Sequence, residues 1–77
     1  MKIPEYLSLE DARRVLAEMG VTLSPRQMKR AAEKDAKGRR KLPFFRDPLQ
    51  GTLKIEKGSL VAAYQRAQTQ AENNLRE

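Results

Sequence analysis

The sequence predicts a small α+β domain with three helices and a two-stranded β-hairpin between the second and the third helix. Two segments begin with a helix-capping residue and continue with apolar residues at helical spacing, and a further apolar stripe lies near the C-terminus. Before that last stripe, an alternating apolar–polar segment follows a cluster of turn-forming residues. The length of 77 residues allows one domain, spanning residues 1–77, with a thin core.

The first helix is predicted at residues 9–19. Residues 1–7 precede it as a short extended lead, because Pro4 disfavours helix. Ser8 is a favourable N-cap, and the acidic residues after it suit the positive end of the helix dipole. Apolar residues then recur along one helical stripe until Gly20, a residue type that commonly ends helices.

The second helix, predicted at residues 25–36, has the stronger start signal. Ser24 is an N-cap residue, Pro25 suits the first helical position and Gln27 completes a capping box. The apolar face of this helix is small, its opposite face is basic, and Gly38 follows it. Two such helices joined by a tight apolar connection predict a helix-turn-helix.

A β-hairpin is predicted at residues 42–56. Leu53 and Ile55 alternate with polar residues, and Asp, Pro and Gly fill the preceding segment, as in a turn. Pro43 cannot donate a backbone hydrogen bond, so the first strand is expected at a sheet edge or short. The hairpin, with two helices before it and one after it, predicts a small winged helix-turn-helix.

The third helix is predicted at residues 57–72, followed by a polar tail of about residues 72–77 that frays. One apolar stripe of this helix consists of Leu60, Tyr64, Ala67 and Ala71. Its first two members are expected to pack on the first helix and the hairpin, and its two alanines to project past the body. The projecting end either serves only as a helical tail or permits the close approach of another protein surface.

The aromatic residues are expected in the core between hairpin and helices: Tyr6, Phe44, Phe45 and Tyr64. Because side chains alternate along a strand, either Phe44 or Phe45 must face outward. The run Phe44-Phe45-Arg46 also has a weaker interpretation as a base-stacking surface for single-stranded nucleic acid.

The charge distribution indicates a polyanionic partner. The net charge is +6, and the segment 26–57 alone, with eleven basic and four acidic residues, carries +7. One basic segment in a chain that is otherwise nearly neutral is typical of proteins that bind nucleic acid. The alternative is a solvated face that serves solubility.

The residue types exclude several classes of chemistry. The chain has no cysteine and no histidine, which excludes disulfides, thiolate or imidazole metal sites and Cys/His nucleophiles. Glu10 and Asp11 are a candidate acid pair, but helix capping explains them. We therefore expect a protein that is not an enzyme and uses no metal or cofactor. Without a signal peptide or a long apolar run, the expected location is the cytoplasm, with no membrane partner.

Three groups of side chains are candidate contacts to duplex DNA. The polar face of the second helix would read bases or hold the backbone through Arg26, Gln27, Lys29, Arg30, Glu33 and Lys34. A basic loop without periodicity would contact phosphates through Lys37, Arg39, Arg40 and Lys41. The hairpin would reach a minor groove or the backbone through Arg46, Gln50 and Lys54. The simpler alternatives are ion pairs with Glu33 or Asp35, a solvated loop, and a strand lysine that prevents edge-to-edge aggregation.

Three segments together form a family-like pattern: Tyr6–Ala12 at the first helix, Leu23–Arg30 at the second and Leu53–Leu60 at the hairpin exit. Over about residues 6–66 this pattern resembles the excisionases, or recombination directionality factors, of the MerR-like winged-helix group. The segment 35–41 is longer and more basic than is usual there, and the aromatic residue often found inside the second helix is missing.

The resemblance implies a small protein that bends double-stranded DNA. Excisionases bind repeated sites beside the attachment site of a phage or integrative element, often cooperatively with further copies, and help a tyrosine integrase to excise the element. Their second helix enters the major groove and their wing the minor groove. The excisionase role is the favoured prediction. The alternatives are a small transcriptional regulator on the same fold and an adaptor whose basic face binds an acidic protein.

Overall fold

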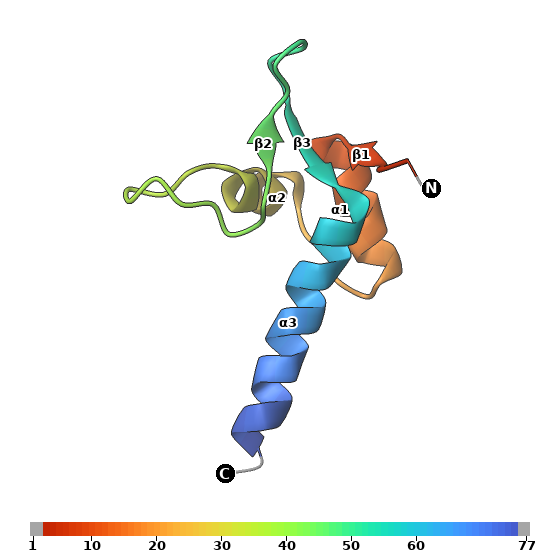
Figure 1. The fold of residues 1–77 in the computed structure, drawn as a ribbon, viewed down its shortest axis with the longest axis vertical. Helices are drawn as coiled ribbons and strands as arrows, with labels where there is room; N and C mark the ends of the chain where they lie inside the picture. The colour runs from red at the N-terminus through yellow and green to blue at the C-terminus, as the bar shows by residue number, and fades with distance from the viewer. Residues whose placement is uncertain (1–2, 76–77) are drawn as a thin grey trace.

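The computed structural model describes residues 3–75, which form an α+β fold of three helices and three strands (Figure 1). In chain order the elements are β1 (Tyr6–Leu7), α1 (Leu9–Glu18), α2 (Pro25–Ala32), β2 (Phe45–Arg46), β3 (Leu53–Glu56) and α3 (Lys57–Leu75). The predicted class and the order of the three helices are confirmed. None of the helices in the described range combines the length and the apolar character that a membrane crossing requires.

The sheet has three antiparallel strands in the order β1-β3-β2, so the prediction of only two strands is wrong. The third strand comes from the predicted extended lead, where Leu7 lies opposite Ile55 of β3. The Lys57 N–H extends this pairing by donating to the Glu5 carbonyl at 2.9 Å. A strand of two residues is too short to show the alternation that identifies strands in a sequence.

The first strand of the hairpin is short and lies at an edge, as Pro43 predicts. β2 begins at residue 45, whereas the hairpin was predicted from residue 42. The Leu42 N–H donates to the Ala31 carbonyl at 3.2 Å, and the Phe44 N–H donates to the Leu42 carbonyl at 2.7 Å. Residues 42–44 are therefore held by α2 and by a tight turn, and the β2–β3 hairpin leaves the body as a narrow ribbon (Figure 1).

The two helix starts follow the predicted caps. The Ser8 hydroxyl accepts from the Asp11 N–H at 3.1 Å, and α1 ends with Met19 as its C-cap before Gly20, whose φ is 94°. At α2 the capping box is complete, because Ser24 and Gln27 each accept a backbone hydrogen bond from the other. Each cap satisfies N–H groups that the first helical turn leaves without partners.

The end of α2 differs from the prediction: the helix stops at Ala32 and not at residue 36. Glu33 already has extended backbone, with ψ of 154°. The chain returns after its loop and supplies partners for the last carbonyls of the helix. The Arg40 Nε donates to the Ala32 carbonyl at 2.8 Å, which adds to the bond that the Ala31 carbonyl accepts from Leu42.

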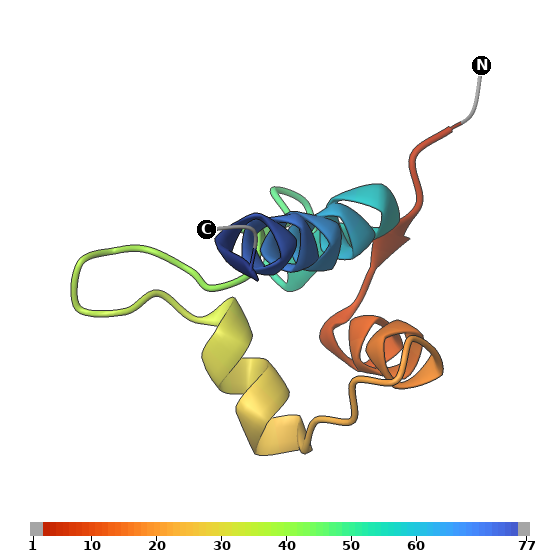
Figure 2. The same cartoon turned by 90° about the horizontal axis from the view of Figure 1, so that it is seen from below.

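The last helix, α3, is longer than predicted, because it remains helical through Leu75 and not only to residue 72. Residues 76–77 lie outside the described range. The Glu56 carboxylate caps the start of α3 by accepting from the Gly58 N–H at 2.7 Å and from the Ser59 N–H at 3.1 Å. From residue 65 to residue 74 the side chains are exposed, and this part of α3 projects from the body (Figures 1 and 2).

The core lies where α1, α2, the sheet and the first turn of α3 meet. Its buried members are Leu7, Ala12, Leu16, Met28, Ala32, Leu42, Phe44, Ile55 and Leu60. Tyr64 is half-buried against this cluster, while the two alanines of the predicted stripe are exposed, as expected.

Two of the aromatic residues expected in the core are on the surface. Tyr6 is 54 % exposed and Phe45 is 40 % exposed, and their rings meet edge to face at 5.5 Å. The strand pairing explains this result, since Tyr6 lies opposite Glu56 and Phe45 lies opposite Lys54, on the face of the sheet away from Ile55. Phe44 is the buried member of its pair.

Candidate nucleic-acid interface

A groove between α2, the hairpin and the start of α1 brings together two of the predicted groups of DNA contacts. We call it the α2–hairpin groove, and its volume is about 660 Å³. Five predicted contact residues line it: Lys29, Glu33, Arg46, Gln50 and Lys54. The first two come from α2 and its C-cap and the other three from the hairpin, so segments distant in sequence share one surface.

The polar face of α2 points away from the core, as predicted. Met28 and Ala32 are buried, whereas Arg26, Lys29 and Arg30 are exposed. Lys29 lies 4.0 Å from the Glu33 carboxylate, at the limit of an ion pair between exposed groups. Such a pair contributes little to stability and does not fix either side chain.

Gln27 has a structural role that the prediction of a base contact did not assign to it. Its Oε1 accepts from the Ser24 N–H at 2.9 Å, and its own N–H donates to the Ser24 hydroxyl at 3.1 Å. This oxygen is therefore committed to the cap of α2. The capping-box pattern in the sequence had already indicated this bond.

Glu33 and Lys34 do not lie on α2, so their assignment to the recognition helix is corrected. The helix ends at Ala32, and Glu33 is its extended C-cap. Lys34 follows in the loop and is exposed. Their side chains are consequently out of register with the exposed face that carries Arg26 and Arg30.

The basic loop is organised around one carboxylate. The Asp35 Oδ1 accepts from the Lys37 N–H at 2.9 Å and from the Arg39 N–H at 3.0 Å. The Asp35 backbone completes the turn, since its N–H donates to the Arg39 carbonyl at 2.7 Å and its carbonyl accepts from the Gly38 N–H at 2.9 Å. Gly38 has a φ of 78°, which glycine adopts without strain.

The four cations predicted in that loop do not share one role. Lys37 and Arg39 are exposed on the turn, which extends away from the body (Figure 2). Arg40 is half-buried, and its Nε donates to the Ala32 carbonyl at the end of α2, a structural role that the prediction of a phosphate contact did not assign to it. Lys41 lies nearer the body, beside a second groove.

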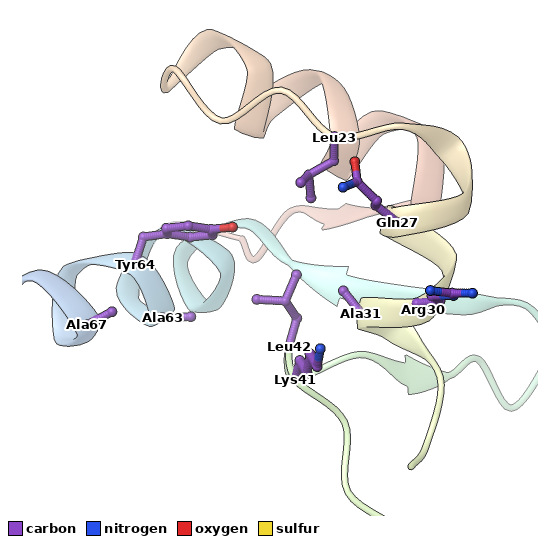
Figure 3. Close-up of a pocket in the computed structure, with 9 residues that line it drawn as sticks. All are labelled: Leu23, Gln27, Arg30, Ala31, Lys41, Leu42, Ala63, Tyr64 and Ala67. Carbon is purple, nitrogen blue, oxygen red and sulfur yellow. The ribbon is translucent and has the colours of Figure 1, made fainter.

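That second groove separates α2 from α3 and is mainly apolar (Figure 3). Leu23, Leu42 and Tyr64 line it, and its volume is about 500 Å³. The groove is also lined by Gln27, Arg30 and Lys41. Two of the predicted DNA-contacting cations, Arg30 and Lys41, therefore face a different groove from the one that Lys29 lines.

Two adjacent residues, Arg46 and Asp47, make the side-chain hydrogen bonds that hold the hairpin loop. The Arg46 guanidinium donates to the Gly51 carbonyl across the loop. The Asp47 Oδ1 accepts from the Leu49 N–H at 2.8 Å and from the Gln50 N–H at 3.2 Å. These two backbone hydrogen bonds lower the pKa of Asp47, because they stabilise its ionised form, and the charge of Lys54 adds to the effect. The cations of the hairpin, Arg46 and Lys54, thus lie on two strands that an ordered turn joins.

Acidic residues also lie at the α2–hairpin groove. Glu10 lines it, but the Arg13 guanidinium donates to both oxygens of that carboxylate. The hydrogen bond from Arg13 lowers the pKa of Glu10, so this side chain is ionised and compensated at neutral pH.

One exposed residue of this region was missed from the sequence: Leu49, at the tip of the hairpin loop, is 95 % exposed. An available signal was its position as an apolar residue inside a run of turn formers, where no strand alternation accounts for it.

Comparison of the chain with models of protein families, with curated proteins and with solved structures finds no match in any of the three. The shape and charge of the α2–hairpin groove therefore carry the inference about what the protein binds.

Proposed function

We propose that the protein is a winged helix-turn-helix that binds double-stranded DNA, with α2 in the major groove and the hairpin as a wing. The observation that carries this proposal is the α2–hairpin groove, which is lined by Lys29 from α2 and by Arg46 and Lys54 from the hairpin. A helix fits the major groove, and a two-stranded ribbon beside it can reach a neighbouring groove or the backbone.

The charges of α2 support an anionic partner. Arg26 lies in the first turn of α2, which holds no acidic residue, and there a positive charge opposes the helix dipole. Within residues 3–75, no ion pair joins Arg26 or Arg30 to a carboxylate. These cations therefore do not stabilise the fold in any way that the structure shows, and phosphates or base edges would supply the partners that they lack.

Within this class, the sequence resemblance favours an excisionase. In that role the protein would bend DNA, load further copies cooperatively on adjacent sites and assist a tyrosine integrase. A small transcriptional regulator would use the same surface. The adaptor alternative would place an acidic protein against the same cations.

The experiment that separates these roles is selection of duplexes from a random-sequence pool, followed by footprinting on the recovered sites. Repeated adjacent sites support the excisionase role, whereas a single palindrome supports a regulator. With about five to seven phosphate contacts, the logarithm of the binding constant should fall against the logarithm of salt concentration with a slope of roughly −5. Absence of any duplex affinity contradicts the proposal and favours the adaptor.

A further inference from the structure

Leu49 lies in the loop that joins β2 to β3, and this loop is the outermost part of the hairpin (Figure 1). It is 95 % exposed, and among the large apolar residues of the described range only Ile3, at 90 %, is similarly exposed. A leucine in this position adds nothing to the core. A polar residue would satisfy the turn equally well, because the turn uses only the backbone N–H of Leu49.

The loop holds Leu49 in place. The Asp47 carboxylate accepts from the Leu49 and Gln50 N–H groups, and the Gly51 N–H donates to the Asp47 carbonyl at 2.8 Å. Pro48 precedes Leu49, and its ring fixes one backbone dihedral of the loop. A side chain on such an ordered turn can enter a narrow site with a small loss of conformational entropy.

The surroundings of Leu49 indicate what kind of site it fits. Arg46 and Lys54 lie behind the tip on the two strands, at the α2–hairpin groove. An apolar tip with cations behind it matches a surface that has an anionic rim and apolar faces stacked inside it. The minor groove has this character, since phosphates line its edges and stacked base pairs form its interior.

We propose that Leu49 enters the minor groove of the duplex held by α2 and wedges between two base pairs, partly unstacking them and bending the DNA. This inference rests on the proposed function and adds to it the residue that produces the bend. Leucine is among the side chains that minor-groove proteins insert in this way. The affected step would be a pyrimidine–purine step, because those steps unstack most easily.

The test compares Leu49→Ala with Ile3→Ala, a matched control that removes an equally exposed apolar side chain outside the hairpin. Fluorescence anisotropy measures affinity for a mixed-sequence duplex of about 30 bp. Ligation by DNA ligase reports how often a mixed-sequence duplex of about 100 bp closes into a ring. Such a duplex is shorter than the persistence length of DNA, so it closes rarely unless a protein bends it. Circular dichroism confirms that each variant is folded.

We expect the unmodified protein and Ile3→Ala to promote ring closure equally. Leu49→Ala should bind the short duplex within about threefold of the unmodified protein, because its phosphate contacts remain. Its ring closure per bound protein should fall by about tenfold, because the wedge is lost. Leu49→Phe, which keeps an apolar wedge, should retain closure.

Two results overturn the inference while leaving the proposed function intact. One is ring closure by Leu49→Ala equal to that of the unmodified protein at equal occupancy. The other is duplex binding by the unmodified protein without any gain in closure. If the unmodified protein does not bind the short duplex at all, the proposed function fails and the inference fails with it.

Discussion

Arg30 and Arg39 are both exposed arginines, but their positions give them different expected roles. Arg30 lies on a helix whose backbone is fixed by a complete cap and a buried opposite face. Arg39 lies on the Asp35 turn, in the loop that follows α2. A base contact needs a fixed direction of approach, whereas a phosphate contact needs only proximity of charge.

We predict that Arg30→Ala loses discrimination between selected and random duplexes by about 1–3 kcal/mol, the value of a bidentate base contact. Arg39→Ala should weaken binding to both duplexes equally, through the loss of one phosphate contact. Competition binding at fixed salt measures both effects. Equal behaviour of the two variants would show that α2 does not read bases.

At the scale of single residues, sequence reasoning succeeded where the partner is close in the chain. The cap at Ser24 was predictable because its partner is three residues away and the geometry of a first helical turn is fixed. The role of Arg40 was not predictable, because its partner at Ala32 depends on how the loop returns to the helix. In the sequence Arg40 looks like the other cations of the loop, because it stands next to Arg39 and Lys41.

At the scale of elements, the helix starts were predictable and the end of α2 was not. Helical periodicity continues in the sequence past Ala32, but the turn built on Asp35 provides competing hydrogen bonds for that segment. β1 was missed because two residues carry no periodic signal and its stability comes from pairing with β3. The first error comes from a local turn that competes with helix, and the second from a tertiary contact that local propensity does not contain.

The hairpin loop should respond to acid through Asp47. Its pKa is lowered in the folded chain, chiefly by the hydrogen bonds from the Leu49 and Gln50 N–H groups. The stabilisation from the ionised carboxylate is therefore present above the unfolded pKa of about 3.9 and is lost as the pH falls through the lower folded pKa. The loop should loosen only in that acidic range, and DNA-binding assays near neutral pH should not show the effect.

NMR titration of the Leu49 and Gln50 amide signals measures this transition. We expect both signals to shift with one midpoint below 3.9 in the unmodified protein. In Asp47→Asn the transition should disappear while the turn persists, because the amide oxygen still accepts hydrogen bonds. A midpoint at the ordinary aspartate value would contradict the hydrogen-bonded turn.

At the scale of the whole molecule, the basic segment was predictable from charge counts, but its division into separate surfaces was not. Lys29 and Lys54 meet at the α2–hairpin groove, whereas the Asp35 turn leaves the body in another direction (Figures 1 and 2). Charge summed along the chain contains no information about direction. The groove exists because the hairpin lies beside α2, and the sequence alone does not contain that arrangement.

The free end of α3 lies at the opposite end of the long axis from the hairpin loop (Figure 1). Residues 65–74 are exposed, and Ala67 alone among them lines the groove between α2 and α3. This segment continues a helix whose first turns pack on the body, so it can extend without packing of its own. In the proposed function, this position would keep it away from the DNA.

Truncation after Gln68 should therefore separate two activities of the protein. This variant keeps Tyr64 and Ala67, which line the groove of Figure 3, and removes only the projecting end. We expect the unfolding free energy to change by less than about 0.5 kcal/mol, the usual limit for exposed positions, and single-site affinity to remain unchanged. Cooperative loading on two adjacent selected sites, measured by gel shift, should fall, because in the proposed function the removed surface would contact a neighbouring copy or an integrase. Cooperative loading by the truncated chain equal to that of the full chain would show that residues 69–77 do not contact a partner.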